Sequence, residues 1–140
     1  MPLGPHKRIP RPRMTNLFLI AAGGAIGAVS RHLTGQWALR TLGPDWPHGT
    51  LMVNVAGGLL MGLFVGWLAV AERPDANALR AFFAVGVLGG FTTFSAFSLD
   101  VVVMIERKAW LGALGYALGS VVLAVLALFV GLMIARKVFA

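Results

Sequence analysis

Long apolar stretches, separated by short segments that carry charges and prolines, dominate the chain. Charged residues delimit four such stretches: Met14–Ser30, Thr50–Ala71, Ala81–Leu99 and Ala109–Ala135. A helix that crosses a bilayer needs about 20 mostly apolar residues, with a range of about 17–25. All four stretches reach this length, the first only at its lower limit, so the pattern predicts four transmembrane helices.

The residues that follow each stretch refine the expected helix ends. Leu33, Trp37 and Leu39 keep the sequence largely apolar after Ser30, so the first helix is expected to continue toward Leu42. Prolines end helices because they lack an N–H group and clash with the preceding turn. Three short connecting loops are expected: Gly43–Gly49, Glu72–Asn77 and Asp100–Lys108.

The composition also indicates a membrane protein. Of the 140 residues, 58% are hydrophobic and 12% are charged, whereas ordinary soluble domains carry roughly 25% charged residues. A soluble four-helix bundle would need polar outer faces, and the predicted helices lack them. The chain has no cysteine, which excludes a disulfide framework and thiol chemistry.

A basic, proline-rich segment precedes the first helix. Residues 1–13 include Lys7, Arg8, Arg11 and Arg13. We interpret this segment as a solvated tail near anionic lipid headgroups, because a short basic tail on a membrane protein is weak ground for nucleic-acid binding. Residues 14–140 are expected to form a single transmembrane domain.

Basic residues outside this tail are balanced between the two sides of the predicted helices. Four lie on the side of the chain ends and four on the other: Arg73, Arg80, Arg136 and Lys137 against Arg31, Arg40, Arg107 and Lys108. The excess of Lys and Arg on one side sets the orientation of a membrane protein. Residues 14–140 therefore have little preference for one orientation in the membrane and could insert both ways, as an antiparallel dimer requires. The basic tail could favour one of the two orientations.

Glycines recur four residues apart in every predicted helix. The pairs and triplet are Gly23 and Gly27; Gly58, Gly62 and Gly66; Gly86 and Gly90; Gly115 and Gly119. Small residues at this spacing let membrane helices approach closely. Packing within one bundle would explain part of the pattern, but small residues on all four helices favour a homo-oligomer, most simply a dimer.

The segment Gly86–Asp100 is unusually polar for a membrane span. It places Thr92, Ser95 and Ser98 three residues apart, with Phe94 and Phe97 beside them. Polar groups and irregular backbone persist in a bilayer only where protein or water covers them. The phenylalanines could simply pack, and the hydroxyls could bond to carbonyls of their own helix, but the density of polar groups favours a polar pathway.

Other polar side chains lie in the remaining predicted helices. Asn54 could connect two helices through a hydrogen bond, or it could line a pore with its hydrogen-bond donors. Tyr116 and Ser120 share one helical face, although Tyr116 could instead anchor the helix at the membrane interface. Arg31 could reach the headgroups like other residues at helix ends, or line a water-filled mouth that attracts anions.

Acidic residues are expected only outside the centres of the spans. Asp45, Glu72, Asp75, Asp100 and Glu106 all fall in predicted loops or at span ends. A proton relay or a buried cation-binding acid is therefore unsupported. The sequence also shows no Ser-His-Asp set, metal-ligand cluster or phosphate-binding loop, so it does not favour an enzyme.

Taken together, three motifs resemble those of the Fluc/CrcB family of small fluoride channels. They are Gly24-Ala25-x-Gly27-Ala28-x-x-Arg31, then Gly49-Thr50-Leu51-x-Val53-Asn54-x-x-Gly57, then Gly89-Gly90-Phe91-Thr92-Thr93-Phe94-Ser95-x-Phe97-Ser98, with Tyr116 and Ser120 following. The resemblance covers nearly the whole chain after the tail, and the third motif is highly specific. The sequence departs from the family at Ala96, where Thr is frequent, and at Val87 and Leu88.

The resemblance implies an all-α membrane protein of four helices per subunit, with the third helix broken at its middle. It further implies an antiparallel, dual-topology homodimer that exports fluoride passively across the bacterial cytoplasmic membrane and so relieves fluoride toxicity. The fluoride pathway would involve Asn54, Phe94, Phe97, Ser95, Tyr116, Ser120 and Arg31. Backbone carbonyls of Gly89 and Thr92 would bind one structural sodium ion that is not transported.

Two other functions are compatible with four short spans. A small dimeric multidrug or cation transporter would normally need a membrane-embedded acid for coupling, which the sequence does not predict. A subunit that only assembles with others would leave the polar segment of the third span unexplained.

Overall fold

The computed structural model describes residues 14–139, all of whose regular elements are helices; the predicted basic tail at residues 1–13 lies outside this range. The elements are α1 (Met14–Leu42), α2 (His48–Val70), α3 (Ala76–Leu79), the π-helix η1 (Arg80–Leu88), α4 (Gly89–Phe91), α5 (Ser95–Glu106) and α6 (Trp110–Phe139). Over the described residues, four helical segments are long and apolar enough to cross a membrane: Met14–Leu42, His48–Val70, Ala76–Glu106 and Trp110–Phe139. The prediction of four spans is confirmed.

The first helix continues to Leu42, as its apolar residues predicted. The next residue, Gly43, has a φ of +84°, which lies in the left-handed region that glycine adopts without steric cost. The Gly43 N–H donates to the Leu39 carbonyl at 3.2 Å, which satisfies one of the free carbonyls at the helix end. Residues 44–47 then connect α1 to α2.

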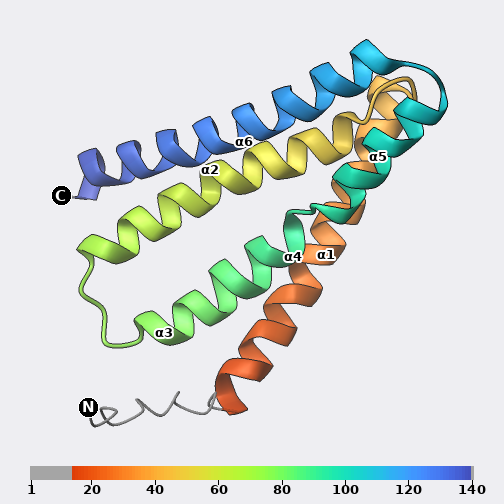
Figure 1. Cartoon of the computed structure of the whole chain (residues 1–140). Coiled ribbons are helices and arrows are strands. Elements are labelled where there is room, and N and C mark those ends of the chain that lie inside the picture. The colour runs from red at the N-terminus through yellow and green to blue at the C-terminus, as the bar shows by residue number, and fades with distance from the viewer. Residues whose placement is uncertain (1–13, 140) are drawn as a thin grey trace, which may run out of the picture.

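The helices form two closely packed pairs. Figure 1 shows α2 running alongside α6 in the same direction, while α1 crosses the third span at η1 and α4. Small residues permit both contacts: a Cβ atom on Gly58 would lie 2.6 Å from the Ala124 carbonyl oxygen, and one on Gly90 would lie 2.6 Å from that of Gly24. Several of the predicted glycine contacts are therefore made within one chain.

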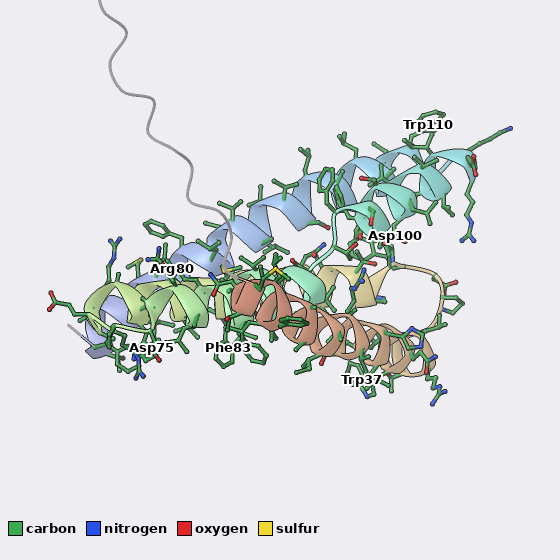
Figure 2. All side chains as sticks on the ribbon, turned by 90° about the horizontal axis from the view of Figure 1, so that it is seen from below. Trp37, Asp75, Arg80, Phe83, Asp100 and Trp110 are labelled. Atoms are coloured by element: carbon green, nitrogen blue, oxygen red, sulfur yellow. The ribbon has the colours of Figure 1, made fainter. Side chains whose placement is uncertain are left out.

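The glycines of α6 do not follow this pattern. Apart from the neighbouring backbone of α6 itself, a Cβ atom on Gly115 or Gly119 would meet no atom of the described residues within 4 Å. Large apolar side chains also cover the outside of the molecule, and Figure 2 shows Trp37 and Trp110 projecting from α1 and α6. Such apolar outer faces are suited to lipid or to another protein surface.

The third span is not one continuous α-helix. Its helical backbone stops at Phe91 and resumes at Ser95, and Thr92 has extended angles of φ −78° and ψ 158°. Figure 1 shows the chain changing direction between α4 and α5. The predicted loop beginning at Asp100 is wrong, because α5 runs on to Glu106. Asp100 therefore lies inside a helix.

Candidate functional site

The interruption of the third span is held by Asn54 of α2. Its Nδ2 donates to the Thr93 carbonyl at 2.9 Å, and its Oδ1 accepts from the Thr93 N–H at 2.8 Å. These two bonds give the Thr93 peptide groups partners that a continuous helix would otherwise supply. Of the two roles that the sequence left open for Asn54, the interhelical hydrogen bond is observed, and it uses one of the two amide hydrogens.

The same interruption frees two backbone carbonyls from their usual helical donors. In a continuous helix the N–H of residue i+4 donates to the carbonyl of residue i. Here the Thr93 N–H donates to Asn54 instead of Gly89, and the Ala96 N–H donates to the Thr93 hydroxyl at 3.1 Å instead of the Thr92 carbonyl. The carbonyls of Gly89 and Thr92 are thus available as oxygen ligands, and carbonyl oxygen is a suitable ligand for a hard cation.

The hydroxyl groups of this segment have different partners. Thr92 donates to the Leu88 carbonyl and Ser98 to the Phe94 carbonyl, both at 2.9 Å, so these two hydroxyls bond back to the preceding turn. The Ser95 hydroxyl lies 3.4 Å from that of Thr93. The spacing of three residues would put Thr92, Ser95 and Ser98 near one face of a continuous helix, but the interruption separates Thr92 from the other two.

Aromatic rings form a row from the interruption toward the α1–α2 loop. The ring centroids of Phe94 and Phe97 are 5.4 Å apart, and those of Phe97 and Tyr116 are 5.5 Å apart. Trp46 continues the row, with its ring 5.2 Å from that of Tyr116. Phe97 and Tyr116 are buried, whereas Phe94 is 76% exposed and faces outward from the single chain.

Tyr116 and Asp100 connect α6 to α5 through a hydrogen bond. The Tyr116 hydroxyl donates to Asp100 Oδ2 at 3.2 Å, and Tyr116 is fully buried. This contact explains why the predicted loop was wrong: Asp100 is a partially covered helical residue with a polar partner, not the start of a solvated loop. Burial also places Tyr116 on the inner face of α6, so it does not extend outward as an interfacial anchor would.

Ser120 lies one helical turn from Tyr116 on the same face of α6. It is 4% exposed, and within residues 14–139 its hydroxyl is the one buried side-chain polar atom without a hydrogen-bond partner. Burying an unpaired hydroxyl is unfavourable, so this group is a candidate contact for a polar ligand or water.

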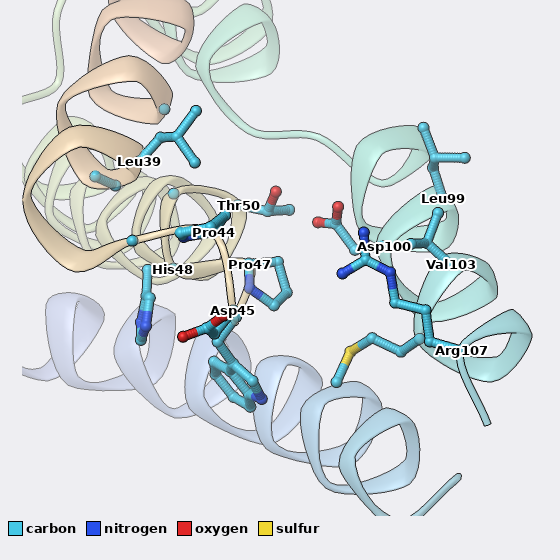
Figure 3. Close-up of a pocket in the computed structure, with 16 residues that line it drawn as sticks. Leu39, Pro44, Asp45, Pro47, His48, Thr50, Leu99, Asp100, Val103 and Arg107 are labelled. Atoms are coloured by element: carbon cyan, nitrogen blue, oxygen red, sulfur yellow. The ribbon is translucent and has the colours of Figure 1, made fainter. Parts of the chain in front are cut away.

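Three cavities of the described structure lie next to these polar residues. The first, of about 350 Å³, lies between the α1–α2 loop and α5, where Asp100 and Arg107 project toward Thr50 (Figure 3). The second, of about 330 Å³, is lined by Arg31 and shares Thr50 with the first. The third, of about 480 Å³, lies at the interruption and shares Thr93 with the second.

The structure thus brings most of the predicted site residues into two groups. The first group is the aromatic row of Phe94, Phe97 and Tyr116 with the neighbouring Ser120. The second group, at the interruption, consists of Asn54, Gly89 and Thr92. Arg31 lines the second cavity. Sequence reasoning missed Trp46, Thr93 and Asp100. Thr93 was within the recognised motif, but its hydrogen bonds to α2 depend on tertiary structure. Trp46 carried only the signal of an aromatic residue between two prolines in a short loop.

Four apolar helices, with a few hydroxyl, carboxamide and aromatic groups between them, define a small multi-pass membrane protein. Residues 18–132 match the family described as CrcB-like protein, Camphor Resistance (CrcB). The chain belongs to this family.

Relatives match nearly the full length of the chain. A protein of Phenylobacterium zucineum named "Fluoride-specific ion channel FluC" is 57% identical over 127 residues, which cover 91% of this chain and 100% of the relative. A protein of the same name from Caulobacter sp. is 53% identical over 126 residues, covering 90% of this chain and 98% of the relative.

Proposed function

We propose that this protein is a fluoride-selective ion channel that lets cytoplasmic fluoride leave the cell passively. The full-length similarity to proteins named as fluoride-specific channels supports this function. The structural observation that carries it is the row of Phe94, Phe97 and Tyr116, next to the unpaired hydroxyl of Ser120. The channel is proposed to act in the bacterial cytoplasmic membrane and to relieve fluoride toxicity.

The chemistry of this row suits a small, strongly hydrated anion. A pathway must replace the hydration shell without holding the ion too tightly. Hydroxyl and carboxamide groups of Asn54, Ser95, Tyr116 and Ser120 are neutral donors. The rings of Phe94 and Phe97 can present their positive edges to an anion. Arg31 in the neighbouring cavity would raise the local concentration of anions.

We also propose a structural sodium ion at the interruption. The freed carbonyls of Gly89 and Thr92 would hold it, and the ion would supply a positive charge that fixes the interrupted backbone without being transported. Two carbonyls are fewer than a hard cation normally takes. A second copy of the chain would double the number, so the sodium site and a homodimer are one proposal.

The dimer is proposed to be antiparallel, with one subunit inverted in the membrane. The balance of basic residues on the two sides of the core supports insertion in both orientations. Phe94, at the interruption, is 76% exposed in the single chain. An exposed aromatic side chain there favours contact with a second subunit.

A coupled transporter of drugs or cations is the competing function, and one observation favours it. Asp100 lies within the third span, where it accepts a hydrogen bond from Tyr116. A carboxylate in a span can take part in proton coupling. A channel, in contrast, needs no driving gradient other than that of the ion itself.

Growth of a fluoride-sensitive bacterium provides the first test. Expression of the chain should restore growth in millimolar fluoride, while Ser120→Ala, which removes the hydroxyl and adds no other atoms, should restore it less well. Comparable membrane levels of both proteins would be checked by immunoblotting. Failure of the native chain to protect cells, despite normal membrane insertion, would contradict the proposed function.

A further inference from the structure

We infer that Trp46 is a positioning residue for Tyr116: its indole packs against the phenol and keeps the hydroxyl on Asp100, which sets the conduction rate. This inference rests on the proposed channel function. Trp46 lies in the loop between α1 and α2 and is not one of the neutral donors proposed for the fluoride pathway, so its role in transport is indirect.

The contact between the two rings has a defined geometry. Their centroids are 5.2 Å apart and their planes are 82° apart, so one ring meets the face of the other with its edge. This is the preferred arrangement of aromatic pairs, which occurs at centroid distances of about 4.5–7 Å. Phe97 lies on Tyr116 as well, with centroids 5.5 Å apart. Two aromatic neighbours from different elements therefore contact the phenol and limit how it can turn.

The loop that carries Trp46 is restrained on both sides. Pro44 and Pro47 flank it closely, and proline fixes its own φ near −65°. The Trp46 carbonyl also accepts a hydrogen bond from the His48 N–H at 2.8 Å, and the two side-chain rings are 5.7 Å apart. The indole is thus held by a short, stiff connection between α1 and α2.

The Tyr116 hydroxyl depends on this support. Its 3.2 Å distance to Asp100 is longer than the usual 2.5–3.0 Å for an O–H donor and an oxygen acceptor. The hydrogen bond is therefore long, and packing of the neighbouring rings contributes to holding the hydroxyl near Asp100. Loss of the indole would let the phenol turn and leave Asp100 without this donor.

An unpaired Asp100 would affect anions at the mouth of the pathway. Its carboxylate faces the first cavity, together with Asp45, His48 and Arg107 (Figure 3). A carboxylate that has lost its donor presents its negative charge more fully to the cavity and repels an approaching anion. Removal of the indole should therefore slow fluoride without altering the phenylalanines.

A double-mutant cycle separates positioning from general packing. Fluoride efflux would be measured for Trp46→Leu and Trp46→Phe, each with native Tyr116 and with Tyr116→Phe. We expect Trp46→Leu to lower efflux by about fivefold or more and Trp46→Phe by less than about twofold. With Tyr116→Phe, the same Trp46→Leu change should cost less than about twofold, because the hydroxyl that Trp46 positions is gone. Equal losses in both backgrounds would overturn the inference.

A spectroscopic measurement tests the contact independently of transport. Tyr116 is the one tyrosine of the chain, so ring-labelled ¹³C-tyrosine reports on it alone by NMR. The signal of Cζ, the ring carbon that bears the hydroxyl, responds mainly to the hydrogen bond of the phenol. This signal should move in Trp46→Leu and stay near its native position in Trp110→Leu, a matched change at an exposed tryptophan of α6. An unmoved signal in Trp46→Leu would overturn the inference.

The efflux measurement and the NMR measurement together distinguish a failure of this inference from a failure of the proposed function. If the native protein does not pass fluoride, the proposed function fails, while the NMR signal still decides whether Trp46 positions Tyr116. Trp46→Met replaces Trp46→Leu if the latter does not fold, as judged by gel filtration and circular dichroism.

Discussion

Asn54 and Thr93, which are 39 residues apart in the sequence, exchange two hydrogen bonds between α2 and the interrupted third span. The carboxamide acts as a substitute for a backbone peptide group, since it donates to the carbonyl and accepts from the N–H of the same residue. The backbone groups of Thr93 at the interruption therefore have hydrogen-bond partners. Because Asn54 supplies these partners, the conformation of the interruption depends on the position of α2.

Removal of this carboxamide should destabilise the protein and disturb transport. Asn54→Leu keeps most of the volume but leaves both Thr93 peptide groups without these partners. The unpaired groups should cost about 1–3 kcal/mol, measured as a lower midpoint of thermal unfolding in detergent, and fluoride efflux should fall.

Asn77→Leu is the matched control, because Asn77 is an exposed residue of α3. Its unfolding midpoint and efflux should stay close to native. A native-like midpoint for Asn54→Leu would show that water or other groups satisfy Thr93 equally well, in conflict with the role assigned to the carboxamide.

The two phenylalanines should matter for transport in a way that their hydrophobicity does not explain. Phe94→Ile and Phe97→Ile keep apolar bulk but remove the ring quadrupole. Each should lower fluoride efflux at least about tenfold, equivalent to about 1.4 kcal/mol in the barrier. Phe97→Ile should also lower stability, because Phe97 is buried within the single chain.

Phe129→Ile offers a comparison on the exposed face of α6, where the side chain is 58% exposed. Its efflux should remain native. Near-normal efflux in both Phe94→Ile and Phe97→Ile would instead assign these residues to packing alone.

Dual topology can be measured by cysteine labelling, because the chain has no native cysteine. Asn77→Cys and Ala109→Cys lie at opposite ends of the third span. If one subunit of each dimer is inverted, a membrane-impermeant thiol reagent should label each variant from both sides of the membrane. Deletion of residues 7–13 should bring the two fractions closer to equal, because it removes basic residues from one side.

Labelling of each variant from a single side only, with and without residues 7–13, would exclude the inverted dimer. It would also leave the shared sodium site without the second pair of carbonyls that it requires.

The proposed sodium ion should stabilise the dimer. A ligand that binds only the folded assembly raises its stability in proportion to the logarithm of ligand concentration. Exchange of sodium for N-methyl-D-glucamine should therefore lower the dimer's unfolding midpoint, and added sodium should restore it. Midpoints that are the same with and without sodium, at equal ionic strength, would argue against the site.

The four spans could be predicted because apolar length is a local property of the sequence. The continuation of α1 to Leu42 followed from three apolar residues, and the structure confirms it. The assignment of Asp100 to a loop failed because a charge was taken as a helix boundary. Its partner, Tyr116, is 16 residues away on another helix, and no local pattern reveals such a contact.

The candidate site was predictable in its residue types but only partly in its geometry. Helical spacing placed Thr92 on one face with Ser95, yet Asn54 and the Thr93 hydroxyl redirect the backbone between them. The neutral donors and rings could be chosen from the sequence because polar groups are costly in a membrane span. Their order in space depends on interhelical hydrogen bonds that spacing alone does not encode.

Efflux from proteoliposomes tests the channel proposal most directly. Vesicles containing the purified protein and potassium fluoride would be diluted into potassium-free buffer with valinomycin at equal pH on both sides, and an electrode would record released fluoride. Parallel vesicles would contain potassium chloride. The account predicts rapid fluoride release and little chloride release without any proton or sodium gradient. Equal release of the two anions, or fluoride release only under a proton gradient, would contradict it.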